Sequence, residues 1–86
     1  MQSFDYTLTD PVGIHARPAA LLVKEIKSHS GDKITLSCNG KTANGQSLLS
    51  LMALGAKKGQ TVTVQVEGAD EISVSEALKA FFAANL

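Results

Sequence analysis

A histidine and an arginine stand two residues apart in the segment Gly13-Ile14-His15-Ala16-Arg17-Pro18-Ala19-Ala20. Proline is tolerated in a helix only near the first turn, so Pro18 predicts a helix that starts within a residue or two of Ala16. His15 would then lie beside the unpaired N–H groups of Ala16 and Arg17 and beside the positive end of the helix dipole. The Arg17 guanidinium adds a permanent, forked cation suited to phosphate. A nucleophilic imidazole facing an anion site is what the acceptance of a phosphoryl group requires.

Length and composition limit the classes of protein to which the chain can belong. The chain has 86 residues, of which 44% are hydrophobic, so we expect residues 1–86 to form one small globular domain. Eight basic residues balance eight acidic ones, which gives no general attraction to nucleic acid or anionic membranes. The lone Cys38 fits a reducing cytosol, and no signal peptide or membrane span is recognisable, so a cytoplasmic protein without membrane insertion is expected. Two scattered histidines and one cysteine make a metal site improbable, and none is expected.

Hydrophobic periodicity predicts alternating strands and helices. Residues 3–8 and Thr61–Glu67 alternate as half-buried strands, and Asn39-Gly40 is a hairpin signal between two more. A first helix buries the i, i+3, i+4, i+7 set Ala19, Leu22, Val23 and Ile26 and is expected to end at Gly31. The last helix is expected to begin at a capping box formed by Ser73 and Glu76. The face that it is expected to bury consists of Val74, Ala77, Leu78 and Phe81.

The element order β-α-β-β-α-β-α therefore predicts an α/β (α+β) two-layer, open-faced sandwich. Four strands with one apolar face each would form an antiparallel sheet, and three amphipathic helices would cover that face. The other face of the sheet would contact water. The residues alone leave the strand order open.

A short helix over 48–54 is more apolar than one buried stripe requires. Ser47 is the expected N-cap and Gly55 the expected stop. Leu51, with Leu48 or Leu54, can face the core, which leaves Leu49 and Met52 as candidates for a contact patch. The alternative is a short helix that is simply well buried.

Three stretches, GIHARPAA, NGKTANGQSLLSLMALG and VEGADE, resemble the histidine-containing phosphocarrier (HPr) family of the bacterial sugar phosphotransferase system. The resemblance covers essentially the whole chain. It implies a sheet of order 1-4-2-3. It also implies that His15 accepts a phosphoryl group at Nδ1 from phosphorylated enzyme I, with phosphoenolpyruvate as the upstream donor, and passes it to enzyme II A components for sugar uptake. Arg17 would clamp the phosphate. Such a protein is a carrier acted on by partner enzymes and not itself an enzyme, and it needs no cofactor.

The resemblance further implies that the first two helices form the docking face for enzyme I and the II A proteins. The residues expected there are Ala16, Ala20, Lys24, Lys27, Leu48, Leu49 and Met52. Ser47 aligns with the serine that a dedicated kinase phosphorylates in relatives from low-GC Gram-positive bacteria, which adds a serine kinase/phosphorylase and a transcriptional regulator as partners. Gly45 and Gln46 depart from the family pattern beside this serine. A monomer is expected.

Two other functions stay open at this point. A nitrogen-branch or mainly regulatory member of the same family would share most of these residues. A small RNA-binding α/β module would need aromatic side chains on the exposed face of the sheet. Phe4 and Tyr6 alternate onto the face assigned to the core, which disfavours RNA binding. His29 falls near the end of the first helix, where a structural role is the simpler interpretation.

Overall fold

The computed structural model describes residues 1–29 and 31–86. Helices and strands follow one another as the periodicity predicts, in the order β-α-β-β-α-β-α. The elements are β1 (Gln2–Thr7), α1 (Ala16–Lys27), β2 (Lys33–Cys38), β3 (Lys41–Asn44), α2 (Leu48–Ala53), β4 (Thr61–Glu67) and α3 (Glu71–Asn85).

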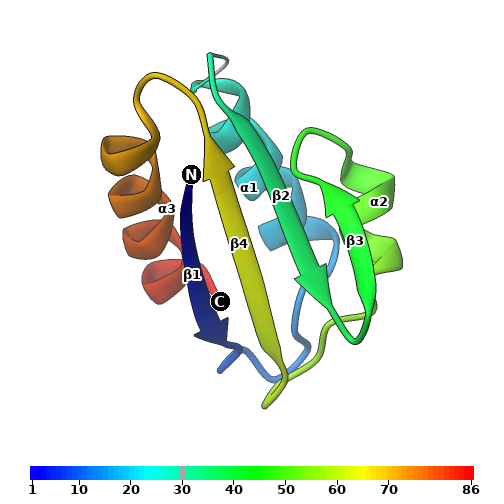
Figure 1. Ribbon diagram of the computed structural model, residues 1–86. Helices are drawn as coiled ribbons and strands as arrows, with labels where there is room; N and C mark the ends of the chain where they lie inside the picture. The colour runs from blue at the N-terminus through cyan, green and yellow to red at the C-terminus, as the bar shows by residue number, and fades with distance from the viewer. Residues whose placement is uncertain (30) are drawn as a thin grey trace.

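The four strands form one sheet in the order β1-β4-β2-β3, and each neighbouring pair is antiparallel. All three helices lie on the same side of this sheet, with α3 behind β1, α2 behind β3 and α1 between them (Figure 1). The opposite face carries short polar side chains, including Thr7, Thr61 and Thr63, which hydrogen bond across the strands. The open-faced sandwich and the order 1-4-2-3 are confirmed.

The core lies between β4 and the helices. Val62, Val64 and Val66 of β4 are fully buried, because alternate residues of a strand point to the same face. Phe82 of α3 fills the space beneath β1, where its ring packs edge to face against Phe4 and Tyr6 at centroid distances of 5.9 and 5.4 Å. Edge-to-face pairs of this kind add about 0.5–1.5 kcal/mol beyond the area that they bury.

The start and the buried face of α3 differ from the prediction. The helix begins at Glu71 with Asp70 as its N-cap residue, so Ser73 lies inside the first turn and the expected capping box with Glu76 is wrong. The Ser73 hydroxyl donates instead to the backbone oxygen of Asp70 (3.2 Å). The earlier start also adds an acidic residue next to the positive end of the helix, which is favourable.

The apolar stripe of α3 runs through Val74, Leu78 and Phe82, which are four residues apart, and Phe81 is only half-buried beside it. The expected use of Phe81 as a core residue was therefore partly wrong. The end of α1 was also misplaced, since the helix stops at Lys27 and Ser28 is its C-cap. The C-cap residue Ser28 keeps a right-handed helical conformation, so the helix can end there without a glycine. Gly31 lies beyond this end and is not the C-cap.

Candidate functional site

His15 is the N-cap residue of α1. Its backbone is extended (φ −121°, ψ −177°), and its carbonyl oxygen accepts the first helical hydrogen bond from the N–H of Ala19 (2.9 Å). Its imidazole forms no capping hydrogen bond within residues 1–29 and 31–86, and 39% of the side chain is exposed. The ring is thus placed at the helix end without being used to close it.

Two backbone donors and one cation lie next to the imidazole. The N–H groups of Ala16 and Arg17 have no acceptor four residues back, because the helix begins with them, and Pro18 has no N–H to satisfy. Arg17 is exposed, and its guanidinium forms no ion pair with the described carboxylates. The start of α1 at Ala16 agrees with the position of Pro18, and these groups can together attract an anion.

The loop before His15 is fixed to the loop after α2. The N–H of Ile14 donates to the carbonyl oxygen of Ala56 (3.0 Å), and the Ile14 side chain is buried. Gly13 has a positive φ of 80°, and a Cβ atom there would lie 2.3 Å from the same oxygen of Ala56. Only glycine allows this close approach, which places the backbone of His15 relative to the sheet.

His15 lies in a shallow depression whose other lining residues are Asp10, Arg17, Pro18, Leu21 and Asn85. Asp10 is a site residue that the sequence interpretation missed. Its Oδ1 lies 3.8 Å from Nε2 of His15, within ion-pair range but beyond hydrogen-bonding distance. The Asp-Pro-Val-Gly turn was visible in the sequence, but the direction of its first side chain depends on the path of the loop.

Helices α1 and α2 contact each other, and both carry exposed side chains, apolar and basic on α1 and apolar on α2. We call the exposed side chains of these two helices the α1–α2 face. Its most exposed apolar member is Leu49 (81%). The seven residues that the sequence suggested for docking are all exposed on α1 or α2: Ala16, Ala20, Lys24, Lys27, Leu48, Leu49 and Met52. Leu21 is also exposed and was missed, because it lies just outside the apolar stripe used to predict the helix.

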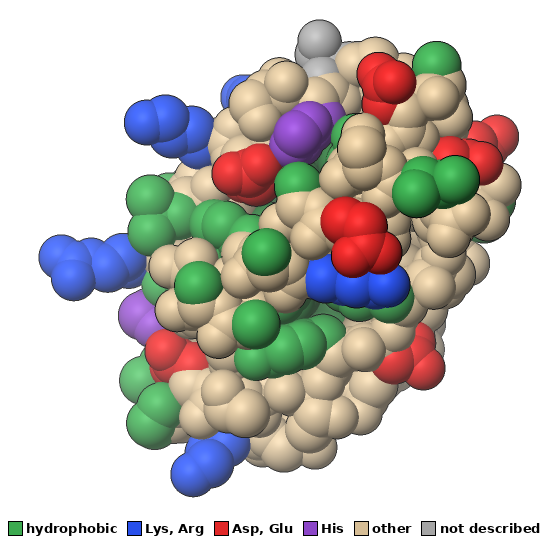
Figure 2. All heavy atoms as spheres, turned by 90° about the vertical axis from the view of Figure 1, so that its left-hand side faces the viewer, with side chains coloured by type: hydrophobic (Ala, Val, Ile, Leu, Met, Phe, Trp, Pro, Cys, Tyr) green, Lys and Arg blue, Asp and Glu red, His purple; other side chains and the backbone are tan. Residues whose placement is uncertain are grey.

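The orientation of α2 explains this surface. Leu51 and Leu54 are buried, which leaves Leu48, Leu49 and Met52 in contact with solvent, so the expectation of a partly exposed helix is confirmed. Figure 2 views the molecule from the β1 and α3 side, with the helical layer at its left-hand margin. Basic side chains project from this margin beside hydrophobic ones, and acidic side chains lie both near the margin and over the remainder of the view, where a basic side chain is also visible.

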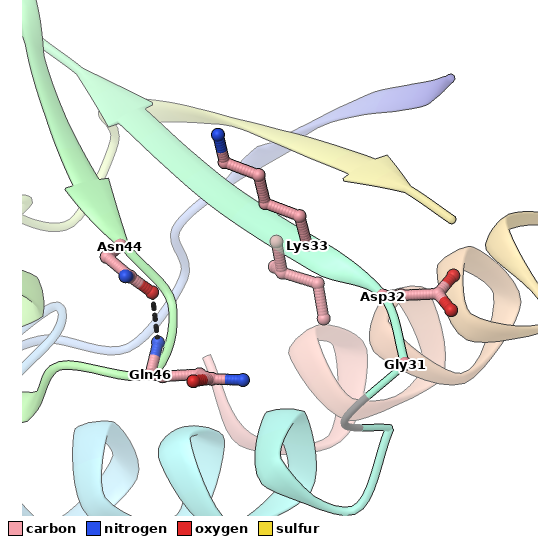
Figure 3. Close-up of a pocket in the computed structure, with 6 residues that line it drawn as sticks. Gly31, Asp32, Lys33, Asn44 and Gln46 are labelled. Atoms are coloured by element: carbon pink, nitrogen blue, oxygen red, sulfur yellow. Dashed lines mark hydrogen bonds between the residues drawn. The ribbon is translucent and has the colours of Figure 1, made fainter. Parts of the chain in front are cut away.

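Ser47 is the N-cap of α2, as expected. Its Oγ accepts a hydrogen bond from the N–H of Ser50 (3.3 Å). Asn44 orders the preceding turn, because its Oδ1 accepts from the N–H of Gln46 and its carbonyl oxygen accepts from that of Ser47. Figure 3 shows this turn beside a polar hollow that is separate from the His15 depression, with the Asp32 carboxylate pointing away from Gln46.

The remaining candidates have structural explanations. His29 pairs with Glu25 in the last turn of α1, four residues earlier (Nε2 to Oε2, 2.9 Å), which supports the structural role expected of it. Phe4 and Tyr6 pack against Phe82, so they are turned away from the open face of the sheet on which RNA would stack. Outside the single undescribed position, no group of histidine, cysteine and carboxylate side chains could hold a metal ion. Within the same residues, every helix is too short or too polar to cross a bilayer.

Comparison with known proteins gives consistent matches over almost the whole length. A family model described as the PTS HPr component phosphorylation site matches residues 2–84. A phosphocarrier protein HPr from Mycoplasma genitalium is 36% identical over 80 residues, which are 93% of this chain and 91% of that protein.

Two solved structures have the same fold. The histidine-containing phosphocarrier protein of a mycoplasma has a TM-score of 0.88 and 38% identity, with 93% of this chain and 90% of that chain covered. HPr-C-His from Thermoanaerobacter tengcongensis has a TM-score of 0.91 and 30% identity, with 99% and 94% covered.

Proposed function

The chain belongs to the HPr family of phosphocarrier proteins, and we propose that it receives a phosphoryl group on Nδ1 of His15 from phosphorylated enzyme I and passes it to enzyme II A proteins. The observation that supports this most is the position of His15 as the N-cap of a helix, with a ring that makes no capping bond to the described residues. We also propose that residues 1–86 act as a single carrier unit.

The groups around His15 suit a transferred phosphoryl group. In the transition state, negative charge is spread over the phosphoryl oxygens, and preorganised donors stabilise it. The N–H groups of Ala16 and Arg17 supply such donors at the positive end of α1, and the Arg17 guanidinium adds a movable charge. The exposure of His15 gives two successive partners access to the same nitrogen.

We assign partner docking to the α1–α2 face. Its centre is apolar, with Leu49 and Met52 exposed, and its α1 side carries Lys24 and Lys27. An apolar centre with a charged rim is the usual composition of a transient protein interface. Enzyme I and the II A proteins would use the same surface in turn, which is consistent with its position beside His15.

The test is a phosphorylation reaction analysed by intact-protein mass. The wild-type chain is incubated with enzyme I, magnesium and phosphoenolpyruvate, beside His15→Ala and the matched control His29→Ala. We expect one acid-labile phosphate on the wild type and on the control, and none on His15→Ala. Phosphate on His15→Ala, or no phosphate on any of the three with a competent enzyme I, would refute the carrier function.

We propose a second, regulatory modification at Ser47. Its hydroxyl is half-buried at the start of α2, directly before the exposed Leu48 and Leu49. A phosphoserine at this position would be favoured by the helix dipole but would put about two negative charges beside the apolar docking surface. Phosphorylation by a dedicated serine kinase would therefore weaken docking of enzyme I and present a new surface to a transcriptional regulator.

The regulatory proposal has its own test. A purified kinase of that type should add one acid-stable phosphate to the wild type and none to Ser47→Ala, with Ser50→Ala as a control that keeps the N-cap. The phosphorylated protein should accept phosphate from enzyme I more slowly. If the kinase leaves Ser47 unmodified, the regulatory role is refuted while the role of His15 stands.

A further inference from the structure

Asp10 is the only carboxylate among the residues that line the His15 depression. Its Oδ1 lies 3.8 Å from Nε2 of His15, and both side chains are partly shielded from solvent, with 27% and 39% exposed. This distance is too long for a hydrogen bond in the present conformation, so the coupling between the two groups is electrostatic. The carboxylate lies on the Nε2 side of the ring.

The Asp10 carboxylate is held in this place by the backbone around it. Its Oδ1 accepts a hydrogen bond from the N–H of Val12 (2.9 Å), which forms an Asx turn. The carbonyl oxygen of Asp10 accepts from the N–H of Gly13 (3.0 Å), and the N–H of Asp10 donates to the main-chain oxygen of Leu86 (2.8 Å). A side chain tied down in this way presents a fixed charge to the imidazole.

We propose that Asp10 is a positioning residue that selects the His15 tautomer with its proton on Nε2. In a neutral imidazole one nitrogen carries the proton and the other carries the lone pair, and a fixed charge nearer to one nitrogen shifts the balance between the two tautomers. A carboxylate on the Nε2 side favours the proton there, so the lone pair stays on Nδ1, the nitrogen assigned to phosphoryl transfer. This inference rests on the proposed function.

The same charge acts during transfer. The Nδ1 lone pair forms the new N–P bond, while the bond from phosphorus to the donor breaks and its electron pair leaves with the donor. His15 keeps its Nε2 proton and becomes a cationic phosphoimidazole, whose positive charge faces Asp10. Arg17 is the other ionised group that lines the depression. Its positive charge repels the charge on the phosphoimidazole ring, but its guanidinium can donate hydrogen bonds to the phosphoryl oxygens.

The first readout is the tautomer of His15 in ¹⁵N-labelled protein, measured by NMR at a pH where the free imidazole is neutral. The variant is Asp10→Asn, which keeps an Oδ1 acceptor for Val12 but removes the charge. Asp5→Asn is the matched control, because Asp5 also accepts through Oδ1, from Thr63 on the open sheet face. We expect the Nε2–H form to dominate in wild type and Asp5→Asn and to lose population in Asp10→Asn.

The second readout is the single-turnover rate of phosphoryl transfer from enzyme I. Asp10→Asn should be about fivefold slower than Asp5→Asn, the effect of one charge at this distance in a largely aqueous dielectric. An unchanged tautomer population in Asp10→Asn would overturn the inference, and so would a transfer rate equal to the control. If instead no variant accepts phosphate, the carrier function fails, while the tautomer measurement still tests Asp10.

Discussion

Arg17 contributes a charge to the His15 site without contributing a buried side chain to the core. Arg17→Ala should therefore slow phosphoryl transfer in both directions by about 10- to 100-fold, the loss of one charge-assisted hydrogen bond to phosphate. Its free energy of unfolding should stay within about 0.5 kcal/mol of wild type. Single-turnover kinetics and urea unfolding measure the two effects.

Lys41→Ala is the matched control for Arg17, because it removes an exposed positive charge from the hairpin strand β3. It should leave the transfer rate unchanged. If Arg17→Ala behaves like Lys41→Ala, the guanidinium has no part in transfer and the clamp role is wrong.

The position of a single residue could be predicted from the sequence where it depends on its immediate neighbours in the chain, and not where it depends on the path of a loop. The place of His15 at a helix start follows from Pro18, because proline restricts where a helix can begin. The contact between Asp10 and His15 does not follow, because it needs the loop to bring a turn residue back over the helix end. The exposure of Leu21 was also missed. Helical periodicity shows which face of α1 is buried, but not how far the packing of neighbouring elements extends around the helix.

The loop before α1 depends on the close approach of Gly13 to Ala56, which a side chain would prevent. Gly13→Ala should lose about 2–4 kcal/mol of unfolding free energy, from the left-handed backbone together with the overlap. Gly40→Ala is the matched control, because Gly40 also has positive φ (77°) but a Cβ atom there would meet open space. Urea unfolding of both variants separates the two contributions.

The control Gly40→Ala should cost about 1–2 kcal/mol, from backbone strain alone. If Gly13→Ala is no less stable than Gly40→Ala, the contact with Ala56 does not hold the loop. A larger loss of transfer activity in Gly13→Ala than its remaining folded fraction explains would show that the loop also places His15.

Helix α2 presents Leu49 to solvent, where it contributes little to the core. Leu49→Ala should leave stability unchanged but weaken binding of enzyme I by about 5- to 10-fold, if Leu49 is one of the few central residues whose truncation costs about 1 kcal/mol or more. Ile72→Ala on α3 is the matched control, because Ile72 is also largely exposed (67%) but lies off the α1–α2 face. Equal affinities for the two variants would exclude α2 from the docking surface.

The element boundaries show what periodicity can and cannot fix. It predicts three of the four residues assigned to the buried face of α1, with Val23 only partly buried, and the split of α2 into buried and exposed leucines, because both follow from the angle between successive residues. It misplaces the start of α3, where Ser73 offers a plausible capping pattern but Asp70 is the N-cap. Several polar residues near that end can act as a cap, and the packing of Phe82 on β1 determines the helix position.

Over the whole molecule the formal charge is zero, and basic side chains project from the helical side, with acidic side chains both near them and elsewhere (Figure 2). An acidic partner should therefore be steered toward Lys24 and Lys27. The association rate with enzyme I should fall as salt rises, and less steeply for the double variant Lys24→Ala with Lys27→Ala. Stopped-flow binding over a salt series would measure this, and identical slopes would rule out steering by these lysines.

The global architecture was largely predictable. Alternating apolar residues fix which strand face is buried, and short connections limit the possible topologies. Strand order came from the family resemblance rather than from the residues, because every strand here has the same one-sided pattern and could pair with several others. The structure resolves this by burying β4 at the centre between β1 and β2.

The most direct test of the central claim is to locate the phosphorus atom. Protein labelled with ¹⁵N in histidine is phosphorylated by enzyme I and phosphoenolpyruvate, and the ³¹P–¹⁵N coupling is recorded by NMR. The structure and the family together predict coupling to Nδ1 of His15, with the Nε2 proton retained. Coupling to Nε2 of His15, or to either nitrogen of His29, would contradict the assigned site.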